Sequence, residues 1–205
     1  MKKNPARNVN LKNEPSFLLE KINNSIDVDK RLYAEDIAGS IAHCTMLAKS
    51  KIISLKECEK INKALRQIER DIKKGKIKFN PKLEDIHMNI EALLFKKIGN
   101  VAGKLHTSRS RNDQVATDMK LWIRSKIKYM DLELKNFQKV LIQVSKKNTK
   151  TVMPGYTHLQ IAQVISLAHH HMAYVEMIGR DRSRLKDCIY RLDENYWLCW
   201  MCLCS

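Results

Sequence analysis

The sequence predicts an all-α fold, in which a small N-terminal helical domain leads into the first long helices of a central helical bundle. Three observations favour this fold class. Apolar residues recur every three or four positions along most of the chain, which is the spacing of one helix face. No segment alternates polar and apolar residues over the length of a strand. Glycine, a frequent turn residue, accounts for only 6 of 205 residues.

The composition indicates a folded protein with a basic surface. Hydrophobic residues make up 44% of the chain, which is enough for one or two domains with a core. The net charge of +16 favours anionic partners, such as nucleic acid, acidic lipid or metabolites with several carboxylates. The lysines are spread over many segments without interleaved aromatic residues, so neither nucleic acid nor a membrane is the expected partner. A cytoplasmic location is expected, since the basic N-terminus lacks the apolar segment of a signal peptide.

No metal or cofactor is expected from the cysteine and histidine patterns. Cys199 and Cys202 have the spacing of a metal-ligand pair, but the sequence offers no second pair. The three adjacent histidines at 169–171 would diverge by about 100° per residue on a helix, so they would not converge on one ion. The remaining cysteines are scattered through helical patterns or lie in the tail, which is compatible with a reducing compartment.

The first three helices are predicted from apolar spacing and from their end signals. Ser54 and Glu57 form a capping-box pattern at the start of the second helix, and Gly75 ends it. Gly99 marks the end of the third helix in the same way. The predicted helices cover 34–50, 54–75 and 84–98.

A polar stretch over 106–122, HTSRSRNDQVATDMKLW, is the most informative part of the sequence. It offers two guanidinium groups, three hydroxyls and an amide within six residues, just before Asp113 and Gln114 open a helix. A helix start has free backbone N–H groups and partial positive charge, so this stretch is suited to bind a carboxylate or a phosphate. The alternative is a polar, capped loop with solvated arginines.

Two long helices are predicted after this stretch. Apolar residues at intervals of three to five predict a bundle helix over 113–148. A loop ending at Met-Pro-Gly follows, and Tyr156-Thr157-His158 is expected to begin another helix, over 157–192. The expected domains are a polar arm over 1–17, an N-terminal helical domain over 18–112, the start of a central bundle domain over 113–195, and an atypical tail over 196–205.

Four ordered motifs together resemble the argininosuccinate lyase family of the fumarase and aspartase superfamily. They are the Ser-Arg-Asn-Asp-Gln run at 110–114, the Gly-Tyr-Thr-His-Leu-Gln run at 155–160, NSIDVDKRL at 24–32 and EDIHMNIE at 84–91. The resemblance implies reversible elimination of fumarate from argininosuccinate to give arginine, as a step of arginine biosynthesis. It also implies a homotetramer whose active sites combine residues from several subunits.

The resemblance also implies roles for individual residues. His158 is the strongest candidate for proton transfer, because the pKa of an ordinary histidine lies near neutrality. Arg111 would supply positive potential and a bidentate contact. Structural roles remain open for Ser25 as a helix N-cap and for His87 and His158 as core histidines. The carboxylate-binding candidates are Ser25, Asn112 and Thr157, and the possible active-site neighbours are His87 and Gln160.

Two alternatives and two departures from the family pattern qualify this interpretation. Another superfamily lyase, such as an adenylosuccinate lyase, is the second candidate, and a non-catalytic helical oligomerisation or nucleic-acid-binding protein is the third. The family's catalytic serine loop, of Ser-Ser-x-Met-Pro-Gln-Lys-Lys-Asn-Pro type, is not found in this sequence, so we expect little or no lyase activity from the chain alone. The tail YWLCWMCLCS differs abruptly in composition, and we expect that a frameshift produced it.

Overall fold

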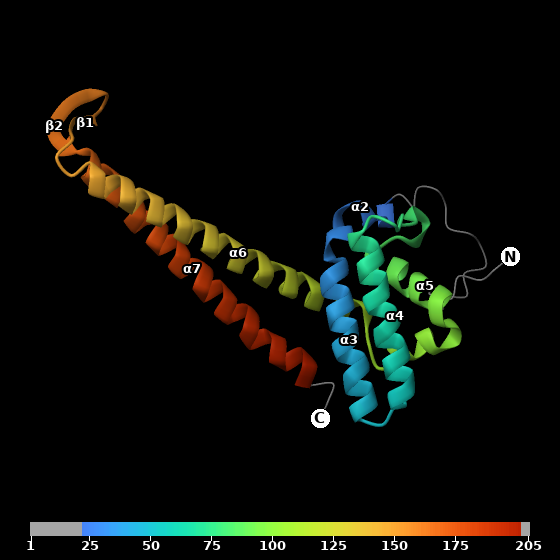
Figure 1. Cartoon of the computed structure of the whole chain (residues 1–205). Helices are drawn as coiled ribbons and strands as arrows, with labels where there is room; N and C mark the ends of the chain where they lie inside the picture. Colours follow the sequence, from blue (N-terminus) through green and yellow to red (C-terminus); the bar gives the residue numbers. More distant parts are fainter. Residues whose placement is uncertain (1–21, 202–205) are drawn as a thin grey trace. The chain divides into compact units, whose positions relative to one another are not determined.

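The computed structural model describes the backbone of residues 22–201 and the side chains of residues 22–193 (Figure 1). The predicted arm over 1–17 lies outside the described residues, as do the side chains of the tail over 196–205. The chain divides into two compact units between Trp122 and Ile123, within its longest helix. Each unit is described by itself. Among the described residues, no helix is both long and apolar enough to cross a membrane.

The first unit is a cluster of helices around one apolar core. It contains α2 (Ile26–Asp29), α3 (Tyr33–Lys49), α4 (Leu55–Lys73), α5 (Ile86–Ile98) and the start of α6 (Arg111–Lys147), with 3-10 turns at Lys30–Leu32, Pro81–Leu83 and Gly99–His106. Its core includes the fully buried side chains of Ile37, Leu47, Ile61, Leu65 and Ile86. The three helices predicted in this region are confirmed to within two residues.

The predicted end signals act at these helices as expected. The Ser54 hydroxyl accepts a hydrogen bond from the Glu57 backbone N–H, and the Glu57 carboxylate accepts one from the Ser54 backbone N–H, which completes the capping box of α4. Gly99 follows α5 with a φ of 69°, a conformation that glycine adopts without strain. Asp85 caps the start of α5, where its carboxylate accepts from the Met88 backbone N–H at 2.6 Å.

The second unit is an antiparallel helix pair closed by a β-hairpin. It contains the rest of α6, β1 (Val152–Thr157), β2 (Gln160–Ser166) and α7 (Leu167–Met201). The two helices run side by side (Figure 1), and polar bridges join them. The Arg182 guanidinium donates to Asp131 at 2.7 and 3.2 Å, and Gln138 Nε2 donates to the Val175 carbonyl at 2.8 Å.

The hairpin corrects the prediction that Tyr156, Thr157 and His158 begin a helix. The fold is mainly α-helical, as predicted, but this short two-stranded sheet separates the two long helices, and α7 begins only at Leu167. A two-residue turn at His158 and Leu159 connects the strands, with φ values of 50° and 64°. Such turns usually contain Asn or Gly, and neither is present here. The usual sequence signal for a hairpin is therefore missing.

Candidate functional site

The start of α6 carries several charged and polar contacts. The helix begins at Arg111, two residues before the predicted start, so Arg111 and Asn112 lie in its first turn. Asn112 is exposed, and its backbone N–H donates to the Ser110 hydroxyl at 3.3 Å. The polar stretch therefore presents an amide side chain and a guanidinium at a helix N-terminus, where an anion is favoured.

Arg111 is held in place by three neighbouring side chains. Its Nη2 donates to Glu91 Oε2 at 3.0 Å, and its Nη1 donates to Gln114 Oε1 at 2.9 Å. Its Nε lies 4.0 Å from Asp85 Oδ2. The side chain is 28% exposed. Arg111 is therefore partly accessible to an anion while its orientation is fixed.

A largely buried polar cluster contacts Arg111 through Gln114. It consists of Asp36 from α3, His87 from α5, Gln114 and Asp118 from α6, and Arg109 from the preceding loop. Asp36 accepts hydrogen bonds from Gln114 Nε2 and from His87 Nδ1, the latter at 3.1 Å. His87 Nδ1 also lies 3.4 Å from Asp118 Oδ2. Asp36, His87 and Asp118 are each no more than 1% exposed.

The two buried aspartates have opposite protonation tendencies. Burial opposes the ionisation of Asp36, but hydrogen bonds from His87 and Gln114 and the charge of Arg109 outweigh it and lower the pKa of this carboxyl. Burial, followed by repulsion from Asp36, raises the pKa of Asp118 to about 9. The cluster therefore holds one carboxylate and one carboxylic acid at neutral pH.

The same cluster is the only group among the described residues whose side-chain types and spacing suggest metal binding. Ligand atoms of Asp36, His87 and Asp118 lie within 4.8 Å of one another. However, Arg109 Nη2 lies 3.8 Å from Asp36 Oδ1, which places a positive charge where a cation would bind. Asp36 also already accepts from His87 and Gln114. A proton held between the carboxyl groups of Asp36 and Asp118 fits this environment better than a metal ion.

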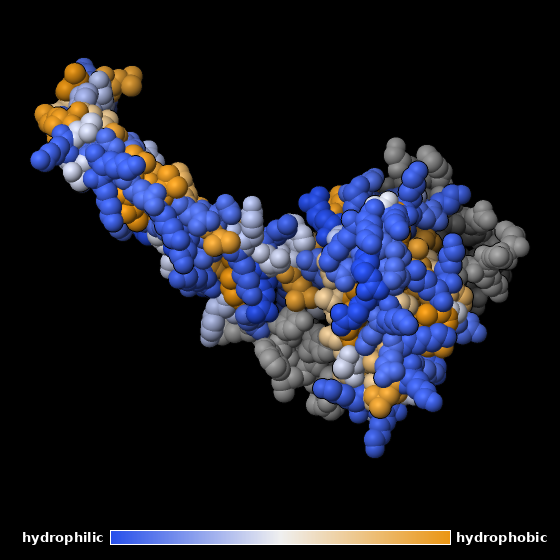
Figure 2. Space-filling view, viewed as in Figure 1, coloured by the Kyte–Doolittle hydropathy of each residue, from blue (hydrophilic) through white to orange (hydrophobic). Residues whose placement is uncertain are grey.

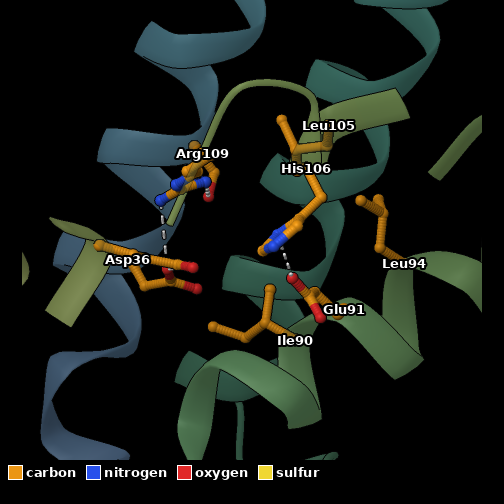
Figure 3. Close-up of a pocket in the computed structure, with 9 residues that line it drawn as sticks. Asp36, Ile90, Glu91, Leu94, Leu105, His106 and Arg109 are labelled. Carbon is orange, nitrogen blue, oxygen red and sulfur yellow. Dashed lines mark hydrogen bonds and ion pairs between the residues drawn. The ribbon is translucent and has the colours of Figure 1, made fainter. Parts of the chain in front are cut away.

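A small cavity of about 10 Å³ lies between the cluster and Glu91 (Figure 3). The Arg109 guanidinium points toward Asp36, and His106 Nδ1 lies 3.2 Å from Glu91 Oε1. Arg109 also donates to the Ser40 hydroxyl at 2.9 Å, and its side chain is only 10% exposed, so it is a structural arginine rather than a solvated one. The cavity has room for about one water molecule and is too small for a metabolite.

Ser25 lies at the N-cap position of α2, but its side chain makes no capping hydrogen bond. Its hydroxyl donates instead to Asp29 Oδ2 at 2.6 Å. Asp29 Oδ1 in turn accepts from the Ile86 backbone N–H at 3.2 Å. Two of the predicted motifs, at 24–32 and 84–91, are thus linked by hydrogen bonds.

The remaining predicted site residues lie together on the hairpin of the second unit. Thr157 ends β1, Gln160 begins β2 and directly opposes Thr157, and His158 occupies the turn between them. All three are exposed. His158 is therefore neither a helix cap nor a core histidine, and the structure brings it together with Thr157 and Gln160.

The predicted site residues thus fall into one group in each unit. Ser25, His87, Arg111 and Asn112 belong to the first unit, and the hairpin residues belong to the second. The sequence did not predict the acidic residues and the amide that contact Arg111 or belong to the polar cluster next to it. A usable signal existed, because Gln114 and Asp118 are four residues apart and so lie on one face of the predicted helix. The missed residues are Asp36, Asp85, Glu91, Gln114 and Asp118.

Comparison with known proteins shows strong similarity to argininosuccinate lyases. The chain is 53% identical over 177 residues to an argininosuccinate lyase of Ehrlichia ruminantium (strain Welgevonden), which covers 86% of this chain and 38% of that protein. It is 51% identical over 185 residues to one of Pelagibacter ubique (strain HTCC1062), which covers 90% of this chain and 40% of that protein. The chain therefore spans about two-fifths of the length of these relatives.

Solved structures show the same fold. An EDDS lyase variant with bound fumarate superposes with a TM-score of 0.70 at 26% identity, covering 80% of this chain and 32% of that one. A class II fumarase from Schistosoma mansoni superposes with a TM-score of 0.66 at 18% identity, covering 78% of this chain and 37% of that one, which supports the fold alone. A family model described as "Lyase" matches residues 10–199. Since that match extends over nearly the whole sequence, the chain belongs to this lyase family.

Proposed function

We propose that this chain supplies part of the active site of an argininosuccinate lyase, which eliminates fumarate reversibly from argininosuccinate and leaves arginine. The observation that carries the proposal is the start of α6. There a partly exposed guanidinium, Arg111, is fixed by Glu91 and Gln114 beside the exposed Asn112 amide. The identity of 51–53% to argininosuccinate lyases supports the choice of substrate.

The reaction requires groups that bind carboxylates and groups that move protons. A base removes the proton from the carbon next to a carboxylate, and the negative charge then develops on that carboxylate. Donors of the first unit, such as Arg111, Asn112 and Ser25, would stabilise this charge, and Thr157 on the hairpin of the second unit would also bind a carboxylate. His158, exposed on the hairpin turn, would take part in proton transfer. An acid protonates the departing guanidinium nitrogen.

The hydrogen bonds of Arg111 among the described residues use two of its five N–H groups. Three N–H groups are left, and a guanidinium can bind a carboxylate through two parallel hydrogen bonds. His87, in contrast, is fully buried among Asp36 and Asp118. We therefore assign it a supporting role within the cluster rather than contact with substrate.

Ligand titration followed by NMR of backbone amides tests the proposal. Argininosuccinate should shift the amide signals of Asn112 and Gln114 at concentrations where adenylosuccinate does not, because only the former carries the expected arginine moiety. Arg111→Met should abolish these shifts. The matched control is Arg66→Met, which removes an exposed arginine from α4 and should leave the shifts intact.

Two outcomes of this titration would contradict the proposal. Equal shifts with adenylosuccinate would favour a different lyase of the superfamily. Shifts produced only by duplex DNA, with an affinity that falls steeply as salt rises, would favour the nucleic-acid-binding alternative.

We also propose that the chain self-associates through its second unit. Large apolar side chains along α6 and α7 are exposed, and Figure 2 shows hydrophobic residues along this helix pair. Exposed apolar area of this extent marks an interaction surface. Light scattering at micromolar concentration should show an oligomer, whereas a stable monomer would refute the proposal. The exposed residues include Tyr129, Leu132, Phe137, Val140 and Met177.

A further inference from the structure

Gln114 lies between the buried Asp36 carboxylate and the partly exposed Arg111 guanidinium. Its Nε2 donates to Asp36 Oδ1, and its Oε1 accepts from Arg111 Nη1 at 2.9 Å. Gln114 is only 3% exposed, so water has little access to either hydrogen bond. One amide thus connects a buried acid to a candidate anion-binding group.

The neighbours of Gln114 determine which way its amide points. The Asp36 carboxylate can only accept hydrogen bonds, and the Arg111 guanidinium can only donate them. A flipped amide would place its oxygen against the carboxylate and its NH2 group against the guanidinium, and both hydrogen bonds would be lost. Only one amide orientation satisfies both partners.

Asp36 is itself fixed, so it provides a rigid anchor for this chain of contacts. It accepts from His87 Nδ1 at 3.1 Å and lies 3.8 Å from Arg109 Nη2. Arg111 has a second anchor in Glu91 on its other terminal nitrogen. Two hydrogen bonds on two different nitrogens fix the plane of a planar group.

We propose that Gln114 is a positioning residue that orients Arg111 toward a substrate carboxylate, by linking it to the buried Asp36. The identity of the anion rests on the proposed function. The link between Asp36, Gln114 and Arg111 is a property of the first unit and is independent of which anion binds.

The chain contains a matched control for this arrangement. On α4, Arg70 Nη2 donates to Gln67 Oε1 at 2.7 Å, and Gln67 Nε2 donates to Asp71 Oδ1 at 2.8 Å. This is the same Arg-Gln-Asp sequence of hydrogen bonds, but it lies on another helix and contacts none of the candidate site residues. Replacing Gln67 therefore removes equivalent chemistry without touching the site.

The test combines Gln114→Met with a double replacement that reverses the polarity of the link. In the variant that carries both Asp36→Asn and Gln114→Glu, the new amide at position 36 donates one N–H to the new carboxylate at position 114, which still accepts from Arg111. Since Gln114 and His87 both contact Asp36 Oδ1, the second N–H of the new amide faces His87 Nδ1, which accepts it in the other neutral tautomer. The net charge is unchanged. Hydrogen exchange and rotation of the Arg111 guanidinium, measured by nitrogen-15 NMR, report its anchoring directly. Fumarate titration reports anion affinity.

In the unmodified chain, we expect guanidinium exchange to be slower for Arg111 than for the exposed Arg66. Gln114→Met should speed the exchange of Arg111 and weaken fumarate binding, each by about tenfold, as for the loss of a hydrogen bond to a charged group. The double replacement should restore both values to within about threefold, whereas Gln114→Glu alone should not, because it places two carboxylates together. Gln67→Met should change neither value.

Three results would overturn the proposal. One is Arg111 exchange as fast as that of Arg66 in the unmodified chain, a measurement that does not depend on any variant folding. The others are an unchanged Arg111 in Gln114→Met and a double replacement that behaves like Gln114→Glu. If fumarate fails to bind while the Arg111 exchange follows the expected order, the proposed function fails and the positioning role of Gln114 stands.

Discussion

Replacing Asp118 by asparagine should remove a pH dependence of folding that originates in the buried cluster. Asp118 is 0% exposed, and its pKa is raised to about 9, first by burial and then by repulsion from Asp36. In the unfolded chain its pKa would be near 4. Between these two values, the folded protein holds a proton that the unfolded chain has released.

The sign of the effect follows from this difference in bound protons. Raising the pH favours the unfolded chain, so the free energy of unfolding should fall as pH increases from about 4 to about 9. One proton corresponds to about 1.4 kcal/mol per pH unit, or about 3 kcal/mol between pH 6 and pH 8. The amide introduced by Asp118→Asn keeps an N–H donor near Asp36 but has no proton to release, so this slope should disappear.

Urea unfolding at a series of pH values, followed by circular dichroism, measures the slope. Other charged or ionisable groups surround position 118 in both proteins, namely Glu35, Asp36, His87 and Arg109, so the difference between the two unfolding curves is the informative quantity. Asp27→Asn is the control, because Asp27 is an exposed aspartate on α2. Parallel curves for Asp118→Asn and the unmodified chain would show that Asp118 is ionised when folded and that our interpretation of the cluster is wrong.

Three further predictions concern the cap of α4, the core of the first unit and the reactivity of two cysteines. Ser54→Ala should lower the free energy of unfolding by about 1 kcal/mol in urea melts, because it removes the capping box of α4, and an unchanged midpoint would contradict this. Leu65→Ala should cost about 2–5 kcal/mol by leaving a cavity in the core, and a loss below about 1 kcal/mol would mean that the core is not packed as described. Burial raises the pKa of the Cys44 thiol to about 12. Iodoacetamide at about pH 8 should therefore label the exposed Cys188 and leave Cys44 unlabelled until the chain unfolds. Peptide mass spectrometry would show which cysteine is labelled.

The helical part of the fold could be predicted because its signals are local. Ser54, Glu57 and Gly99 act within one turn of their own helices, and apolar spacing is decided by residues three or four apart. The hairpin could not be predicted in this way. His158 and Leu159 adopt positive φ values without being glycine or asparagine, so the strand pairing, and not the local preference of the turn, determines their conformation.

The candidate site shows the same division between local and long-range information. Arg111 and Asn112 were identified as candidate site residues from their own stretch of sequence, although α6 begins two residues earlier than predicted. The partners of Arg111 come from distant segments, with Glu91 located 20 residues away in sequence. Asp36 is 78 residues from Gln114, and no local pattern indicates that the two side chains touch.

The irregular pairing within the hairpin determines which way its tip faces. Gly155 pairs with Gln163, but the next residue, Tyr156, pairs with Ile161, so Ala162 is an extra residue in β2. Gly155 permits the close approach there, since a Cβ atom would lie 3.2 Å from the Gln163 carbonyl oxygen. A bulge of this kind bends its strand and increases the local twist, so it turns the tip of the hairpin relative to the rest of the sheet. Deleting Ala162 would therefore keep the residues of the turn and change the direction in which Thr157 and Gln160 are presented. The facing of the hairpin tip is set by a residue that carries no functional group.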